Sequence, residues 1–227
     1  MVTPTNFANG GQTASSTSDV AAVWPTEHQA DDIGILMVQY DGATSPPTSI
    51  SGWTYLGSET TGNVTDGSSL SMFWRRATSG SEGPPSVPIG TSDHVIARIA
   101  GFRGCRTTGS PIHKQASGAN ASASISLSIP GFTTTLNECH VMDICTRGND
   151  ASGAHFSALT NSSLTSTAEE WDLGTTGGNG GGNMMWHGFK DTAGVVDTTT
   201  GTISVSVPTA FFKLALTSLP ETGRRLT

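Results

Sequence analysis

The apolar residues of this chain occur in short runs or alternate with polar residues, and Gly, Pro and Asn separate these runs. Such spacing is typical of β-strands joined by turns. No long window keeps the period of a helix, so we expect little helical structure. The pattern therefore predicts an all-β protein.

The predicted strands fall into two series, one in each half of the chain. In the first half we expect strands at residues 18–24, 33–40, 52–56, 70–77 and 93–103. In the second half we expect them at residues 123–129, 138–146, 163–171, 184–189, 203–207 and 211–216. The nearly continuous apolar run at residues 33–40 is typical of a strand that is buried on both faces.

The two series follow the same plan. Residues 23–25 correspond to 128–130, 32–35 to 138–141, 72–75 to 185–188, and 95–98 to 211–214. This internal repeat predicts a jelly-roll-like β-sandwich built from two pseudo-repeated halves, residues 13–105 and 120–218. We expect a single domain over residues 1–227, with a polar N-terminal leader and a short C-terminal tail. The leader could form a strand, an arm that grips a neighbour, or a disordered segment.

The composition agrees with a β-protein and narrows the range of partners. Only 13% of the residues are charged, and the chain contains 28 glycines. Much of the remaining surface is Ser and Thr, which suit strands and turns. A net charge of −7 with only 11 Lys and Arg gives no reason to expect nucleic-acid binding. The longest apolar runs have the length of a strand and predict no membrane span.

The cysteines predict free thiols. Cys139 and Cys145 share one face of a predicted strand, about 20 Å apart at roughly 3.3 Å per residue, which is too far for a disulfide. Together with Cys105 they form an odd, sparse set, which is typical of a reducing cytoplasm. Residues 1–30 show neither the basic start nor the apolar run of a secretion signal, so we expect synthesis and folding in the host cytoplasm.

Residues 219–223, Leu-Pro-Glu-Thr-Gly, match the sorting pentapeptide of Gram-positive surface proteins. Such proteins also carry a signal peptide and a hydrophobic span after the pentapeptide, and neither pattern occurs here. We interpret the match as coincidence or a cloning remnant.

An ordered set of motifs in the first half resembles a known group of proteins. The set comprises residues 32–38 (Asp-Ile-Gly-Ile-Leu-Met-Val), 52–54 (Gly-Trp-Thr), 73–77 (Phe-Trp-Arg-Arg-Ala) and 100–104 (Ala-Gly-Phe-Arg-Gly). It resembles a diffuse group of phage and prophage virion proteins, which are sandwich-like and usually encoded among head and tail genes. The resemblance covers roughly residues 20–105, and it reaches the second half only through the internal repeat. It implies a structural or adsorption role and supplies no catalytic residue.

The motif residues also have a plain physical interpretation. Trp53 and Trp74 are expected as core aromatics, with a stacking platform for a sugar as the alternative. Three arginines are expected on sheet faces or at strand ends, paired with acidic groups such as Asp31 or Asp32: Arg75, Arg98 and Arg103.

A search for catalytic and metal-binding patterns gives no candidate. Asp93 places a carboxylate next to His94 in the sequence, and neighbours in a strand point to opposite faces. The adjacent carboxylates Glu169 and Glu170 are expected to be solvated. Hydrolase, phosphate-loop and zinc motifs are absent, so we predict no enzyme activity, no cofactor and no metal site.

Two functions follow from these observations. The first is a non-enzymatic structural protein of the phage virion, either a capsid decoration (cement) protein or an accessory tail component. Its partners would be major capsid or tail proteins, and it would form a homo-oligomer, with a trimer as one option. Whether it belongs to head or tail, its copy number and its host stay open.

The alternative is a receptor-binding, lectin-like module of the tail that binds host surface glycans. Trp171 beside a Gly-rich loop would offer the aromatic platform, with Gly178 and Asn179 as further contacts. A glycan-cleaving tail enzyme would need two carboxylates facing each other across a groove, and the sequence singles out no such pair.

Overall fold

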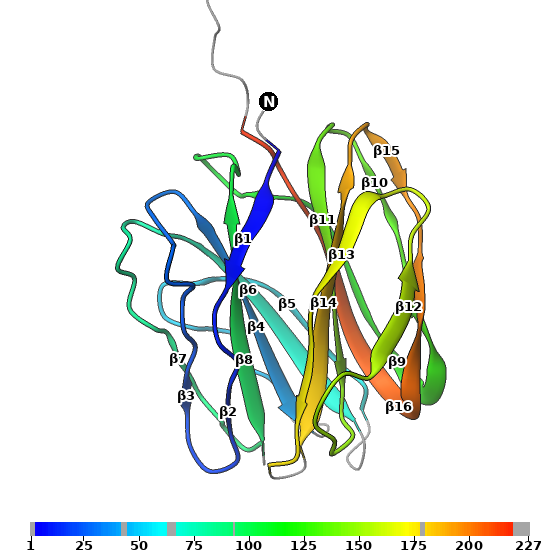
Figure 1. The fold of residues 1–227 in the computed structure, drawn as a ribbon. Coiled ribbons are helices and arrows are strands. Elements are labelled where there is room, and N and C mark those ends of the chain that lie inside the picture. Colours follow the sequence, from blue (N-terminus) through cyan, green and yellow to red (C-terminus); the bar gives the residue numbers. More distant parts are fainter. Residues whose placement is uncertain (1–2, 42–44, 63–66, 93, 178–179, 220–227) are drawn as a thin grey trace, which may run out of the picture.

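Figure 1 shows the computed structural model of the chain, which describes residues 3–41, 45–62, 67–92, 94–177 and 180–219. The first half forms β1 (Thr5–Asn9), β2 (Thr13–Ser15), β3 (Val20–Ala21), β4 (Ile33–Asp41), β5 (Thr54–Thr60), β6 (Ser68–Arg76), β7 (Ser86–Val87) and β8 (Val95–Arg103). The second half forms β9 (Ile112–Ile129), β10 (Phe132–Thr134), β11 (Cys139–Arg147), β12 (Phe156–Thr160), β13 (Thr165–Thr175), β14 (Gly181–Lys190), β15 (Gly194–Val196) and β16 (Thr199–Leu216). The described ranges contain no helix, which confirms the all-β class.

Each half of the chain builds one six-stranded antiparallel sheet. The strand order is β1-β8-β4-β6-β5 in the N-half, where β2 also pairs with β8. The order is β12-β16-β11-β14-β13 in the C-half, where β9 also pairs with β16. The series β8-β4-β6-β5 thus corresponds to β16-β11-β14-β13. Successive strands of a jelly roll alternate between its two sheets, whereas each sheet here comes from one half, so the jelly-roll-like connectivity is not confirmed.

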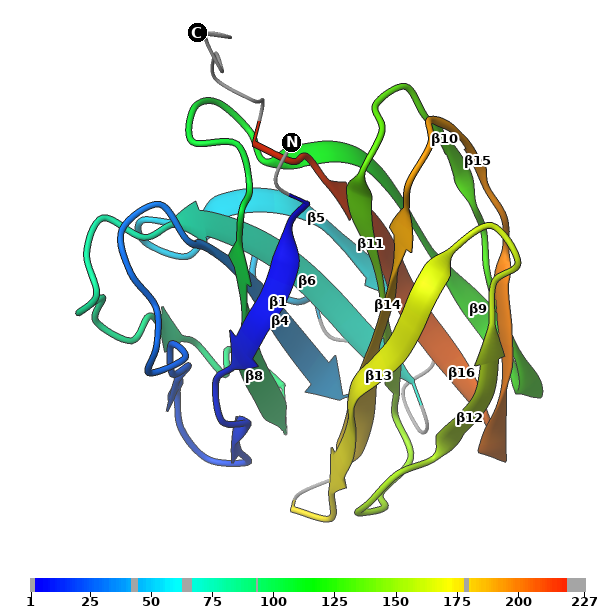
Figure 2. The same ribbon diagram turned by 45° about the horizontal axis from the view of Figure 1, so that its top comes forward.

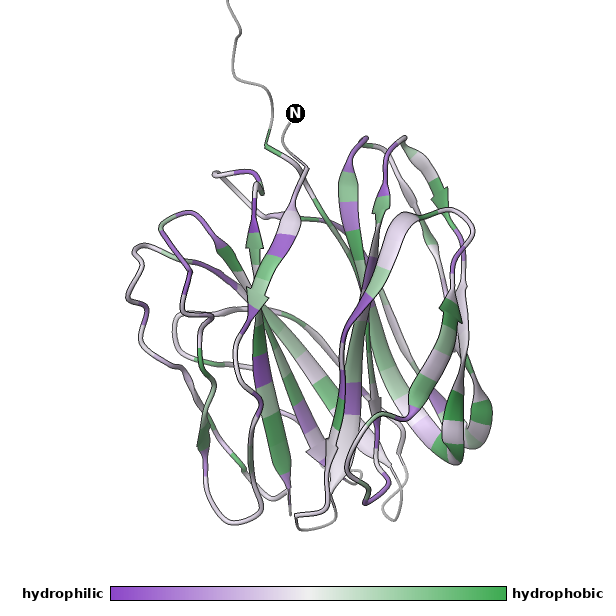
Figure 3. Ribbon diagram, viewed as in Figure 1, coloured by the Kyte–Doolittle hydropathy of each residue, from purple (hydrophilic) through white to green (hydrophobic). Residues whose placement is uncertain are grey.

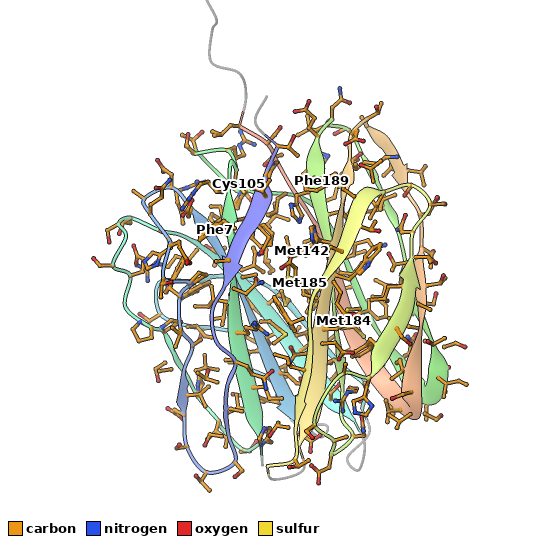
Figure 4. All side chains as sticks on the ribbon, viewed as in Figure 1. Phe7, Cys105, Met142, Met184, Met185 and Phe189 are labelled. Atoms are coloured by element: carbon orange, nitrogen blue, oxygen red, sulfur yellow. The ribbon has the colours of Figure 1, made fainter. Side chains whose placement is uncertain are left out.

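The two sheets face each other across a shared apolar core, which we call the central core (Figure 2). Ile33, Ile35 and Met37 enter it from β4, and Met142 and Ile144 enter it from β11. Figure 4 labels Met142 and Met185 among the side chains of this region. Buried hydrogen bonds extend the contact between the halves at one end, where the Gln39 amide donates to the carbonyl oxygen of Arg147 at 2.8 Å.

The outer face of each sheet is also buried, but the two covers differ. In the N-half, the β3–β7 ribbon and loops that carry Trp24 and Trp53 cover β4, β6 and β8. In the C-half, the distal parts of the long strands β9 and β16 fold over β11 and β14. All residues of β4 and β11 are therefore buried. In Figure 3 the central strands accordingly carry broad apolar segments, whereas β13 is largely pale.

The structure refines the alignment of the repeat. Met72 and Met185 both lie in the central core, as the alignment predicts. However, Ile33 enters the central core, whereas its predicted counterpart Cys139 lies in the outer core of the C-half. The residue of β11 that faces the N-half at this level is His140, whose ring packs on Phe102 at 5.1 Å. A shift of one residue exchanges the two faces of a strand, so the predicted alignment was wrong by one residue here.

The other differences concern the ends of the sheets. The N-terminal leader contributes β1, which pairs with β8, and most of the strand predicted at residues 18–24 is irregular. The strands predicted at 203–207 and 211–216 form one strand, β16. The pairing of β16 with β9 is bulged on either side of Val207, next to Pro208, which has no N–H to donate. Residues 112–122, which the pattern did not predict as a strand, belong to β9.

Two of the three arginines that were predicted to pair with acidic groups do so. Arg103 forms a bidentate pair with Asp32, with N–O distances of 2.9 and 2.7 Å, whereas Arg75 pairs instead with Glu82. Trp53 is buried in the outer core, and Trp74 is partly buried against the central core. The three cysteines are free and buried, and burial raises the pKa of the Cys105 thiol to about 12. Residues 220–223 of the sorting-like pentapeptide, and Asp93, lie outside the described residues.

Candidate functional site

Two histidines from neighbouring strands of the C-half stack on each other where the halves meet. The rings of His140 on β11 and His187 on β14 lie 4.7 Å apart with an interplanar angle of 19°. Phe102 of the N-half meets the edge of His140, and Phe189 packs against both imidazoles. The pair is therefore enclosed by aromatic rings from both halves. We call it the histidine seam.

Glu170 completes the seam from β13. Its carboxylate oxygen Oε1 lies 2.9 Å from Nε2 of His187, and Oε2 accepts a hydrogen bond from the Asn9 amide at 3.0 Å. The register of β13 against β14 shifts between Glu169 and Trp171, so Glu170 sits in a β-bulge. A bulge re-aims a side chain, which explains why Glu170 turns inward while Glu169 stays exposed. The prediction that both carboxylates are solvated was wrong for Glu170.

The N-terminal segment is held to the C-half through this seam. Nδ1–H of His140 donates to the carbonyl oxygen of Pro4 at 2.9 Å, and Asn9 of β1 donates to Glu170. Burial, and then the neighbouring His187, lower the pKa of His140 to about 4. The hydrogen bond from His187 is the main reason why the pKa of Glu170 lies below its usual range. At neutral pH, His140 is therefore uncharged and Glu170 is ionised.

Two ring nitrogens of the seam have no described hydrogen-bond partner. Within the described residues, Nε2 of His140 and Nδ1 of His187 are buried without a hydrogen-bond partner. The described polar partners of the two rings are the carbonyl oxygen of Pro4 and the carboxylate of Glu170. The described ranges also contain no group of three or more His, Cys, Asp or Glu that could hold a metal. Nor do they contain a helix long and apolar enough to cross a membrane.

Trp171, which was predicted to contact glycans, does not form an open platform. Trp171 is only 6% exposed and belongs to the central core. The guanidinium of Arg98 covers one face of its ring at 4.4 Å, and its indole N–H donates to Asn183 at 2.8 Å. A sugar could stack on this ring only if the two halves separated. Gly178 and Asn179 lie outside the described residues.

A different surface has the chemistry that the glycan hypothesis needs. Polar side chains line a groove of about 380 Å³ near the β12–β13 connection, together with Leu159 and Leu164. The polar residues of this groove are Thr160, Asn161, Ser162, Thr167, Thr198 and Thr200. We call it the threonine groove. Sequence reasoning missed it because its residues come from separate loops and strands, with no local motif.

Comparison of the chain with protein-family models, with curated proteins and with solved structures found no match. The resemblance to virion proteins therefore stays a hypothesis, and the functional argument below rests on the sequence and on the geometry described above.

Proposed function

We propose that this chain is a non-enzymatic structural component of a phage particle, as a capsid decoration protein or an accessory tail protein. The observation that carries the proposal is the position of the motifs that resemble virion proteins. They lie on β4, β6 and β8 and in the turns beside them, where they build the two cores of the N-half. Residues in such places specify a rigid body, which suits a structural role.

The outermost strands of the two sheets offer surfaces for neighbouring subunits. β5 and β13 lie at the ends of the two strand orders. Each carries an exposed large apolar residue, Tyr55 at 38% and Leu173 at 37% exposed. Edge strands present unpaired backbone groups, with which another chain can pair. In this proposal the edges pair with other virion proteins or with further copies in a homo-oligomer, such as a trimer, after synthesis in the host cytoplasm.

The first experiment is to label purified particles with a gold-tagged antibody against this chain. Gold over the head identifies a decoration protein, and gold at the tail identifies a tail component. Absence of the chain from intact particles would overturn the proposal.

A variant pair tests the part played by the edge strands. Leu173→Asp places a charge on β13, so the amount of protein bound to particles should fall strongly. Ile125→Asp is the matched control, because Ile125 is 58% exposed and its neighbours Ser124 and Ser126 pair with β16. Equal binding of the two variants would exclude the β13 edge as an attachment surface.

The threonine groove favours a second candidate, the glycan-binding module. Hydroxyl and amide groups flanked by leucines can hydrogen-bond a sugar and cover its apolar face. Thr200→Val should then abolish saturation-transfer NMR signals from host surface glycans, whereas Thr107→Val, in the exposed loop between β8 and β9, should not. Absence of any signal with the wild-type protein at millimolar glycan would exclude this function.

A further inference from the structure

A lysine and an aspartate face each other inside the C-half. Asp143 of β11 lies directly opposite Lys213 of β16 in the antiparallel register. Both side chains are fully buried, and Nζ of Lys213 is 3.5 Å from Oδ1 of Asp143. The amine and the carboxyl group are thus held together without access to water.

Apolar core residues flank the pair along the strands. Asp143 and Lys213 point to the outer face of the C-half sheet, between the core residues Val141 and Cys145 on β11 and next to Trp186 on β14. Such surroundings disfavour charge on either group. Burial raises the pKa of Asp143 to about 6, and burial also lowers the pKa of Lys213. At a given pH, both shifts raise the share of molecules in which the acid and the amine are neutral.

A hydroxyl group bridges the two side chains. The Thr199 hydroxyl donates to Oδ2 of Asp143 at 2.6 Å, and Nζ of Lys213 donates to the same hydroxyl oxygen at 3.0 Å. The amide of Asn161 holds Thr199 in place at 3.0 Å, and the carbonyl oxygen of Asp197 accepts from Lys213, also at 3.0 Å. The amine, the carboxyl group and a proton-relaying hydroxyl therefore form one connected, buried cluster.

We propose that Lys213 and Asp143 form an intramolecular amide bond that covalently joins β16 to β11. The neutral amine Nζ attacks Cγ of the protonated Asp143 carboxyl group, and the N–Cγ bond forms. The Thr199 hydroxyl relays a proton from Nζ to the departing oxygen. One C–O bond of Asp143 then breaks, and one water molecule leaves. The reaction needs no oxidant, reductant or further reactant, because an amine and a carboxylic acid give an amide and water.

Exclusion of water favours the product as well as the reaction. Hydrolysis of the amide would need a water molecule at Cγ, and the cluster is buried under the strands of the outer layer. The bond would close a loop across most of the C-half, so that β16 could not detach from β11 while the protein is partly unfolded. This property is useful on the outside of a particle, but the inference rests only on the geometry of the cluster and not on the proposed function.

Mass spectrometry of the intact, folded protein tests the proposal. The expected mass is lower than the mass of the sequence by one water molecule. Trypsin should release residues 115–147 joined to residues 191–224, because acylated Lys213 is not cleaved. Separate peptides 115–147 and 191–213, together with the full sequence mass after overnight incubation at neutral pH, would overturn the proposal.

Variants distinguish amide formation from other reactions that remove a water molecule. Lys213→Arg keeps the positive charge but offers no amine for the reaction, so the full mass should return. A succinimide at an aspartate elsewhere would also remove one water, but it would persist in Lys213→Arg. Thr199→Val keeps the size of the side chain and removes the relay, so the wild-type mass loss should appear more slowly. Loss of water that is unchanged in Lys213→Arg would contradict the proposed bond.

Discussion

The two halves share one strand order but fill the outer face of the sheet with opposite chemistry. In the N-half, Leu36 of β4 lies opposite Ile99 of β8, and both belong to the outer apolar core. In the C-half, Asp143 of β11 lies opposite Lys213 of β16. The two pairs occupy equivalent places. Met37, which follows Leu36, lies opposite Met72, and Ile144, which follows Asp143, lies opposite Met185.

This difference shows what the fold itself requires. An apolar pair is sufficient to bury the outer face of such a sheet, as the N-half demonstrates. A buried ion pair loses the hydration of both charges, so it is often no more stabilising than a well-packed apolar pair. The Asp143–Lys213 pair therefore calls for a reason beyond packing, and the proposed amide bond supplies one. The four predictions that follow exchange residues between the halves or remove them.

The largest effect is expected for Asp143→Ala. This change removes the acyl group of the amide and leaves the Lys213 amine buried without its partner. Loss of a closed loop of roughly 70 residues costs about 4 kcal/mol by analogy with disulfides. The Lys213 amine, left buried without its carboxyl partner, adds about 1–3 kcal/mol. Urea unfolding followed by tryptophan fluorescence should show this loss, and a change below about 1 kcal/mol would contradict a buried role for the pair.

The next largest effect is expected when an apolar pair like Leu36 and Ile99 of the N-half replaces Asp143 and Lys213 in the C-half. Asp143→Leu with Lys213→Ile removes both polar groups together, so no buried charge is left over. If the amide forms in the wild type, the double variant loses only the loop closure, about 4 kcal/mol. If the pair is merely ionic, the double variant should be as stable as the wild type or more stable. The same urea titration distinguishes these results.

The histidine seam gives a second contrast between the halves, because the place of His140 in the C-half is occupied by Ile33 in the N-half. The pKa of His140 is about 4 in the folded protein, against about 6.5 in an unfolded chain. Its contribution is therefore complete above pH 6.5 and is lost as the pH falls toward 4. At about 1.4 kcal/mol per pKa unit, the folded state should lose about 3 kcal/mol over this window.

His140→Ile should remove this pH dependence. The variant places the residue of the N-half at the seam, so its unfolding free energy should change little between pH 6.5 and pH 4.5. Asn9→Ala is the control, because it removes a hydrogen bond to Glu170 but no titrating histidine, and it should keep the wild-type slope. An unchanged slope in His140→Ile would show that the pH dependence does not come from His140.

The sequence allowed the repeat to be predicted because short-range patterns encode it. The apolar run at 33–40 and its counterpart at 138–146 correspond to β4 and β11, and the shared methionines are placed correctly. The seam and the buried pair could not be predicted in this way. Glu170 turns inward only because of a bulge, and Lys213 meets Asp143 through pairing of strands far apart in the chain. Single-sequence patterns contain neither kind of information, so Trp171 was also wrongly expected on an open surface.

The last comparison is the reverse exchange, Leu36→Asp with Ile99→Lys. It brings a carboxyl group and an amine into the outer core of the N-half, but without counterparts of Thr199 and Asn161. Replacing an apolar pair by a buried ion pair should lower the unfolding free energy by about 1–4 kcal/mol. The mass of this variant should show no loss beyond the single water of the C-half amide. Loss of a second water would mean that burial and proximity alone produce the bond. A hydroxyl such as that of Thr199 would then not be needed for the reaction.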